Sequence, residues 1–126
     1  MADKLCLVPY LGGKNNISDW IVGHFPPHRL YTEPFMGAAN LLLNKPRSDV
    51  EIINDKDDDM VNLFWVVRDQ PQALLDFLSL VPYSRKVFES WKRDWKLGMR
   101  GANPVERAAR LFFLHCAGYS GDPLGT

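Results

Sequence analysis

The sequence predicts an α/β fold in which two parallel strands begin a sheet and a run of helices follows. The chain has 126 residues, of which 46% are hydrophobic and 12% aromatic, enough for one small domain with a compact core. Helix and strand patterns alternate up to residue 53, after which only helical patterns occur. Parallel sheets usually contain several strands and are covered on both faces, so two strands leave this sheet incomplete.

A short helix and a short strand open the chain. Asn15 or Asn16 can cap the helix, and Pro26-Pro27 ends it. The first strand is predicted over residues 29–32 and ends at Glu33-Pro34, since proline cannot donate to a sheet ladder. A mostly buried helix is predicted over residues 37–44, and the second strand over residues 50–53. The apolar face of the first helix comprises Ile17, Trp20, Ile21 and His24.

Start signals then predict four more helices. Asp55, Asp57 and Asp58 cluster where the first begins, because carboxylates are favourable near unpaired helix amides. Pro71 suits the first turn of the second, Ser84 can cap the third, and Asn103-Pro104 with Glu106 approximates a capping box for the fourth. The inward-facing residues are expected to be Met60, Val61, Phe64 and Val67; Ala73, Leu74, Phe77 and Leu78; Val87, Phe88, Trp91 and Trp95; and Val105, Ala108, Ala109, Phe112, Phe113 and Cys116.

The formal net charge is +0, but its distribution is uneven. Residues 1–82 carry 7 basic and 11 acidic side chains, whereas residues 83–126 carry 8 basic and 4 acidic ones. This basic excess is compatible either with a polyanionic partner or with a solvated helix face. No apolar run approaches the roughly 20 residues of a membrane helix, and the N-terminus does not open a signal peptide, so we expect a cytoplasmic protein without membrane contact. Cys6 and Cys116 are expected to be reduced thiols in the core.

Three sequence patterns resemble phosphate- or metal-binding motifs but lack a residue or a geometry that those motifs require. Gly12-Gly13-Lys14 lacks the first glycine and the following Ser or Thr of a phosphate loop. Asp55-x-Asp57-x-Asp59 has Met60 where a calcium loop needs glycine. His24 and His28 have zinc-like spacing, but two prolines separate them. We therefore expect no metal site.

One pair of positions fits a ligand site. In nucleotide-binding α/β folds, a glycine after the first strand lets a ligand approach the backbone, and an acid about 20 residues later binds ribose hydroxyls. Gly37 and Asp55 follow the two predicted strands and are 18 positions apart. Taken alone, the pair fits a ligand site or simple helix capping equally well.

Four sequence blocks, in order and spacing, resemble the D12-class (Dam-like) adenine-N6 DNA methyltransferases. They are Tyr10-Leu11-Gly12-Gly13-Lys14, Tyr31-Thr32-Glu33-Pro34-Phe35-Met36-Gly37, Ile53-Asn54-Asp55 leading into Leu63-Phe64, and Arg107 to Leu114 with Gly118-Tyr119-Ser120-Gly121. The resemblance implies an incomplete Rossmann-like, S-adenosylmethionine-dependent methyltransferase fold with an appended helical DNA-recognition region. Residues 1–82 would form the N-terminal part of the cofactor-binding domain, and residues 83–126 the start of the target-recognition region.

The resemblance also implies an S-adenosylmethionine site. Tyr10 would pack by the cofactor with Lys14 nearby, and Asp55 would accept hydrogen bonds from the ribose hydroxyls. Ile53 or Lys56 could border the adenine. The loop around the methionine and ribose parts would comprise Glu33, Pro34, Phe35 and Gly37.

Double-stranded DNA is the implied partner, as in DNA methylation and restriction-modification. Basic side chains of the second half would neutralise phosphates, and Tyr119 could stack on or wedge between bases. Ser120 stands where family members usually have asparagine, so base-specific contacts are in question. The DNA-binding residues would be Arg85, Lys92, Arg93, Arg100, Tyr119 and Ser120.

The family's catalytic Asp-Pro-Pro-Tyr motif is absent from these 126 residues, and Asp122-Pro123-Leu124-Gly125 is not its equivalent. In the family that motif accepts hydrogens from the amine of a flipped adenine and stacks on the base, so positioning and electrostatic stabilisation would be lost together. We therefore expect no catalytic residue here and no methyl transfer by this chain alone. The alternative function is a non-catalytic DNA-binding or interaction module, oligomeric because the incomplete sheet needs cover.

Overall fold

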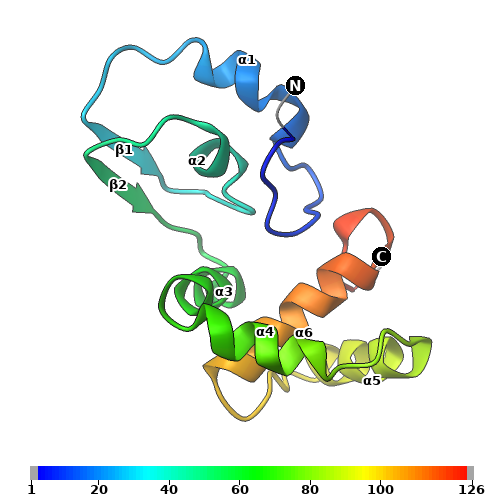
Figure 1. Ribbon diagram of the computed structural model, residues 1–126. Helices are drawn as coiled ribbons and strands as arrows, with labels where there is room; N and C mark the ends of the chain where they lie inside the picture. The colour runs from blue at the N-terminus through cyan, green and yellow to red at the C-terminus, as the bar shows by residue number, and fades with distance from the viewer. Residues whose placement is uncertain (1–2, 125–126) are drawn as a thin grey trace.

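The computed structural model describes residues 3–124, so the first two residues of the chain and the last two of the expected recognition region lie outside the described residues. Its elements divide into a small sheet with two short helices and a group of four longer helices (Figure 1). In chain order they are α1 (Ser18–Val22, after a 3₁₀ turn at Asn15–Ile17), β1 (Leu30–Glu33), α2 (Asn40–Asn44), β2 (Val50–Ile53), α3 (Asp58–Asp69), α4 (Pro71–Ser79), α5 (Arg85–Lys96), α6 (Pro104–Ala117) and a final 3₁₀ turn, η2 (Tyr119–Gly121).

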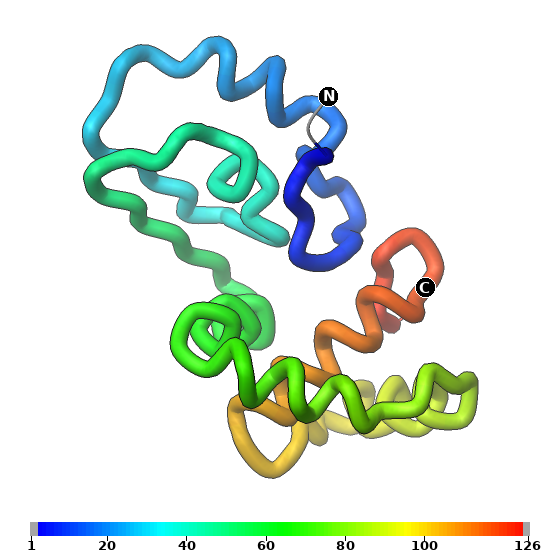
Figure 2. The backbone as a smooth tube through the Cα atoms, viewed as in Figure 1, coloured from blue at the N-terminus to red at the C-terminus, as the bar shows by residue number. Residues whose placement is uncertain are grey.

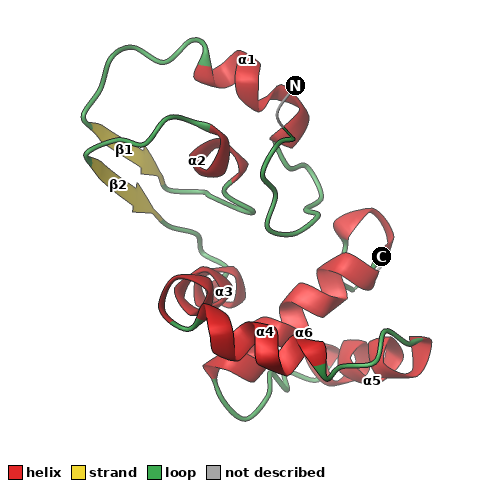
Figure 3. Ribbon diagram, viewed as in Figure 1, coloured by secondary structure: helices red, strands yellow, loops and turns green. Residues whose placement is uncertain are grey.

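The two strands pair in parallel, with Leu30 opposite Val50 and Glu33 opposite Ile53. They are the only strands of the described part of the chain (Figure 3). The second strand has the predicted bounds. The first begins one residue later than predicted because Arg29 contributes only its carbonyl, which accepts from the Val50 amide at 3.0 Å. The mixed fold with an incomplete parallel sheet therefore agrees with the sequence-based expectation.

The first two helices are shorter than predicted. Gly37 and Ala39 adopt left-handed φ values of 52° and 49°, which interrupt a right-handed helix, so α2 begins only at Asn40. Ile17 in the 3₁₀ turn is 52% exposed, Trp20 in α1 is 69% exposed and His24 is exposed too, so the predicted apolar face is wrong for these three residues. α1 is only five residues long, too short to bury a full face.

The hydrophobic core lies mainly between α3 and α6, which make the most extensive helix contact. On α3, Leu63 and Val66 are buried beside Met60, whereas the predicted Val61, Phe64 and Val67 are only half-buried. The buried face of α3 is thus rotated, relative to the prediction, towards α6. Ala73 is exposed, so its predicted inward orientation is wrong too.

Both cysteines are exposed and free, which corrects the expectation of core thiols. Cys116 falls on the outward side of α6, one position after the buried His115. No helix within residues 3–124 is long and apolar enough to cross a membrane, and α6, the longest, has 14 residues.

The predicted caps of α3, α5 and α6 are confirmed, whereas the predicted cap of the first helix by Asn15 or Asn16 is wrong, because Ile17 stands at the N-cap of α1 and makes no side-chain cap bond. The side chain of Asp57 accepts from the amides of Asp59 and Met60, Ser84 accepts from Val87, and Asn103 accepts from Glu106. The Glu106 carboxylate in turn accepts from the Ala102 amide at 2.8 Å, a shifted version of the predicted capping box.

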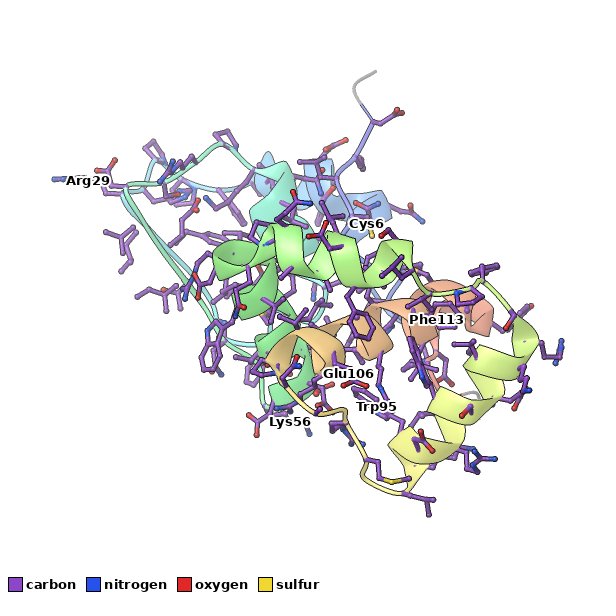
Figure 4. The ribbon with its side chains drawn as sticks, turned by 60° about the horizontal axis from the view of Figure 1, so that its bottom comes forward. Cys6, Arg29, Lys56, Trp95, Glu106 and Phe113 are labelled. Atoms are coloured by element: carbon purple, nitrogen blue, oxygen red, sulfur yellow. The ribbon has the colours of Figure 1, made fainter. Side chains whose placement is uncertain are left out.

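Ion pairs connect the longer helices. Asp59 at the start of α3 accepts from the Nε atoms of Arg100 at 2.9 Å and Arg107 at 2.6 Å. Arg110 bridges Asp94 on α5 and Glu106 on α6, at 3.3 Å and 2.8 Å. Figure 4 labels Trp95 on α5 and Glu106 on α6, the two helices that Arg110 connects.

Candidate functional site

A cavity of about 340 Å³ opens where β1 ends, between the N-terminal loop and the start of α3. Its volume is near the lower end of the roughly 300–1,000 Å³ typical of small-molecule sites. It brings together most of the predicted cofactor residues, namely Tyr10, Lys14, Glu33, Phe35, Gly37 and Asp55. Pro34 lies outside the lining, and its carbonyl accepts from Asn54 Nδ2 at 3.2 Å. Lys56 also lines the cavity, while Met36 and Asn40 are lining residues that the sequence analysis did not single out.

The tips of the two strands meet through Asp55. The Gly37 amide donates to Oδ2 of Asp55 at 2.9 Å, and the Asp57 amide donates to Oδ1 at 3.0 Å. Partial burial opposes ionisation of this carboxyl, but hydrogen bonds from the amides of Asp57, Gly37 and Lys56 outweigh it and hold the pKa of Asp55 below its ordinary value. Asp55 is therefore a carboxylate at neutral pH, with lone pairs left for further donors.

Gly37 permits the close approach of Tyr10 to this loop. A Cβ atom at position 37 would lie 3.1 Å from Cε1 of Tyr10, and the φ of 52° already disfavours other residues. Phe35 projects into solvent beside it with 78% of its surface exposed. One face of the cavity thus offers two aromatic side chains and a fixed carboxylate.

Glu33 adds a second carboxyl to the cavity. Glu33 is only 7% exposed, and the Tyr31 hydroxyl donates to Oε2 of Glu33 at 3.2 Å. Burial raises the pKa of Glu33, although the Tyr31 hydrogen bond and the positive charge of Lys14 act in the opposite direction. A buried carboxyl beside an ammonium group suits a ligand that carries both charges.

His115, which the sequence analysis did not single out, connects the N-terminal loop with η2. Its Nδ1 lies 3.0 Å from the carbonyl oxygens of both Pro9 and Gly121, and its ring stacks on Tyr10 with centroids 5.7 Å apart. Because carbonyl oxygens only accept, Nδ1 carries the hydrogen. The resulting proximity of the N-terminal loop to η2 is visible in Figure 2. The available signal was helical spacing, since His115 follows the buried Leu111 by four residues.

The predicted DNA-binding residues lie outside this cavity. Arg85 and Arg93 are exposed on α5, while Lys92 is half-buried with its ammonium 5.6 Å from the Phe88 ring centroid. Arg100 is partly buried, pairs with Asp59 and lies over the Trp95 ring. Tyr119, which is 91% exposed, and Ser120 occupy η2.

Metal-ligating side chains do not gather anywhere in the described region as a group of three or more. His24 and His28 instead bond through Nδ1 to the carbonyls of Trp20 and Pro26, at 2.7 Å and 2.8 Å.

Comparison with known proteins decides the family. The model of the D12 class N6 adenine-specific DNA methyltransferases matches residues 10–122, nearly the whole chain. The chain belongs to this family. The resemblance read from the four sequence blocks is thereby confirmed.

The D12-class chain covers only part of the length of the curated relatives that it matches. It is 25% identical over 125 residues to the DNA adenine methylase of Escherichia coli K12, covering 96% of this chain and 44% of that protein. The Salmonella typhi DNA adenine methylase gives the same figures. The Vibrio cholerae enzyme of that name is 30% identical over 77 residues, covering 60% of this chain and 27% of the relative. The chain thus spans less than half the length of these relatives.

The buried His115 predicts a pH dependence for this family member. Burial lowers the pKa of His115, although its bonds to Gly121 and Pro9 act against this. The unfolded chain, with an ordinary histidine pKa of about 6.5, then binds more protons, so the free energy of unfolding should fall as pH drops from about 7 to 5.

Urea unfolding at a series of pH values measures this contribution. His115→Gln should show a shallower fall in stability over that range than the wild type, while His24→Gln, altered at an exposed residue, should keep the wild-type slope. The raised pKa of Glu33 acts in the opposite direction in all three proteins and cancels in the comparison. Equal slopes for wild type and His115→Gln would contradict the prediction.

Proposed function

We propose that the cavity binds S-adenosylmethionine and that the chain is the cofactor-binding and DNA-binding part of an adenine-N6 methyltransferase. Residues 1–82 would form the N-terminal part of an incomplete Rossmann-like domain, and residues 83–126 the start of a helical target-recognition region. The observation that carries this proposal is the bond from the Gly37 amide to Asp55, which joins the tips of two parallel strands at the cavity. Ligands of open α/β sheets bind at this carboxyl edge of the strands.

The lining residues fit the parts of this cofactor. The ionised Asp55 can accept from ribose hydroxyls, and Phe35 and Tyr10 offer apolar faces for the nucleoside. Glu33 and Lys14 complement the ammonium and carboxylate groups of the methionine part. When bound, S-adenosylmethionine would supply an activated methyl group, and the residues of this chain would orient it.

Double-stranded DNA is the proposed substrate partner, following the family and the relatives named DNA adenine methylase. We assign phosphate contacts to Arg85, Lys92 and Arg93 on α5, and base stacking to the exposed Tyr119. Ser120, beside Tyr119 on η2, would lie at the same contact. Arg100 would contribute by holding the loop between α5 and α6, because Asp59 already compensates its charge.

The alternative is a non-catalytic DNA-binding or oligomeric module. One observation favours it: an apolar groove of about 640 Å³ runs along the sheet and α3, and it includes the exposed Ile52 and Trp65. A second copy of the chain on this groove would cover the incomplete sheet, and light scattering would then give a dimer mass. Such a module would bind no cofactor, so calorimetry separates the two functions.

Asp55→Ala should weaken S-adenosylmethionine binding about 10- to 100-fold in isothermal titration calorimetry, because a charged acceptor for hydroxyl groups is lost. Asp58→Ala removes a neighbouring exposed carboxylate outside the cavity and should leave the affinity unchanged. No heat of binding with the wild-type chain would refute the cofactor proposal and favour the alternative module.

Another prediction concerns catalysis. The chain alone, given radiolabelled S-adenosylmethionine and adenine-containing duplex DNA, should incorporate no methyl group above background, because its sequence has no Asp-Pro-Pro-Tyr motif. Turnover by the purified chain would show that other residues perform the transfer.

A further prediction concerns α5. The triple variant Arg85→Ala, Lys92→Ala, Arg93→Ala should bind a duplex of about 20 base pairs more weakly in fluorescence anisotropy, whatever its sequence. The slope of log affinity against log salt should fall by about one for each lost phosphate contact. Arg29→Ala is the control, since Arg29 is exposed at the far end of the sheet (Figure 4). A triple variant with the wild-type slope would remove α5 from the interface.

A further inference from the structure

Asn40, a residue of the cavity lining, has a buried side-chain oxygen without a hydrogen-bond partner. This first residue of α2 lines the cavity and is only 5% exposed. Its Oδ1 is the one buried side-chain oxygen or nitrogen, among the residues described, that has no hydrogen-bond partner. Buried polar atoms in native proteins nearly always have partners, so such an exception calls for an explanation. A ligand that donates a hydrogen bond supplies one.

The N-terminal loop is shaped around this carboxamide. A Cβ atom at position 13 would lie 2.9 Å from Asn40 Nδ2, so the absence of a side chain at Gly13 leaves the room that Asn40 occupies. Lys14, the next residue, lines the same cavity, as does the buried Glu33. The lining of one cavity therefore includes an ammonium, a carboxyl and a carboxamide whose Oδ1 has no partner within the protein.

This set of groups is complementary to an α-amino acid. The ammonium group of such a ligand needs several acceptors, which the Glu33 carboxylate and Asn40 Oδ1 provide, and its carboxylate needs a cation, which Lys14 provides. Asp55 and Lys56 reach the cavity from another segment, between β2 and α3, so they remain available for the nucleoside.

We propose that Asn40 is a specificity residue that recognises the amino-acid end of the ligand, its Oδ1 accepting a hydrogen bond from the α-ammonium group. This assignment rests on the proposed function, since it takes S-adenosylmethionine as the ligand. A nucleoside that lacks the amino-acid part leaves Oδ1 unpaired and gains nothing from Asn40. The residue therefore favours ligands that carry the whole cofactor skeleton over truncated thionucleosides.

Two probes separate this role from general cavity integrity. S-Adenosylhomocysteine carries the amino-acid part, and 5′-methylthioadenosine lacks it. Asn40→Leu, similar in size but apolar, should weaken binding of S-adenosylhomocysteine about tenfold in calorimetry and change that of methylthioadenosine less than about twofold. Asn40→Asp keeps an acceptor at this position, so it should bind S-adenosylhomocysteine within about threefold of the wild type.

The outcomes are distinguishable. If the wild-type chain binds both probes and Asn40→Leu weakens both equally or neither, the role of Asn40 is refuted while the cofactor site stands. If the wild type binds neither probe, the proposed function fails and this assignment fails with it. Should Asn40→Leu lose its folded circular dichroism spectrum, Asn40→Asp decides instead: a large loss of S-adenosylhomocysteine affinity in the folded aspartate variant refutes the role.

Discussion

The hydrogen bond between the Gly37 amide and Asp55 is the contact on which the site depends. Two strands of four residues are marginal alone, and past their carboxyl ends the ladder continues through the amides of Asn54 and Met36, which donate to the carbonyls of Glu33 and Asn54. Asp55 then fixes the loop after β1 and, through the Asp57 amide, the start of α3. One carboxylate thus orders the cavity and remains able to accept from a ligand.

Ala39 and Ser120 occupy special backbone positions beside the cavity loop and in η2. These are the non-glycine residues with positive φ in the described chain, at 49° and 54°. Glycine, and asparagine to a lesser degree, adopt this conformation at little cost, whereas alanine and serine pay roughly 1–2 kcal/mol. Both turns therefore hold a left-handed backbone with residues that disfavour it, so the backbone path at these positions is fixed by the surrounding structure.

Local features of the fold were predictable, and long-range ones were not. Caps such as Ser84 and Asn103 act within three residues, so the sequence displays them directly. The site residues also follow local rules, because side chains after parallel strands meet at one edge. The rotated burial of α3 depends on where α6 packs, and the His115 bond to Pro9 spans 106 positions. The hydrophobic periodicity of the sequence does not indicate which distant segments make such contacts. Asn40 was missed for the same reason, since only the fold brings it to the cavity and against Gly13.

The charge imbalance between the two halves of the chain has a structural explanation. Three arginines of the basic half are neutralised within the fold, Arg100 and Arg107 by Asp59, and Arg110 by Asp94 and Glu106. Asp59 belongs to the acidic half, residues 1–82. Its ion pairs with Arg100 and Arg107 therefore compensate part of the charge difference between the two halves. The uncompensated basic surface therefore lies on α5, where the exposed pair of Arg85 and Glu89, 3.6 Å apart, is weak. Both interpretations of the basic excess, a solvated helix face and a polyanion-binding surface, therefore concern α5. A salt-dependent affinity of α5 for DNA would distinguish the second from the first.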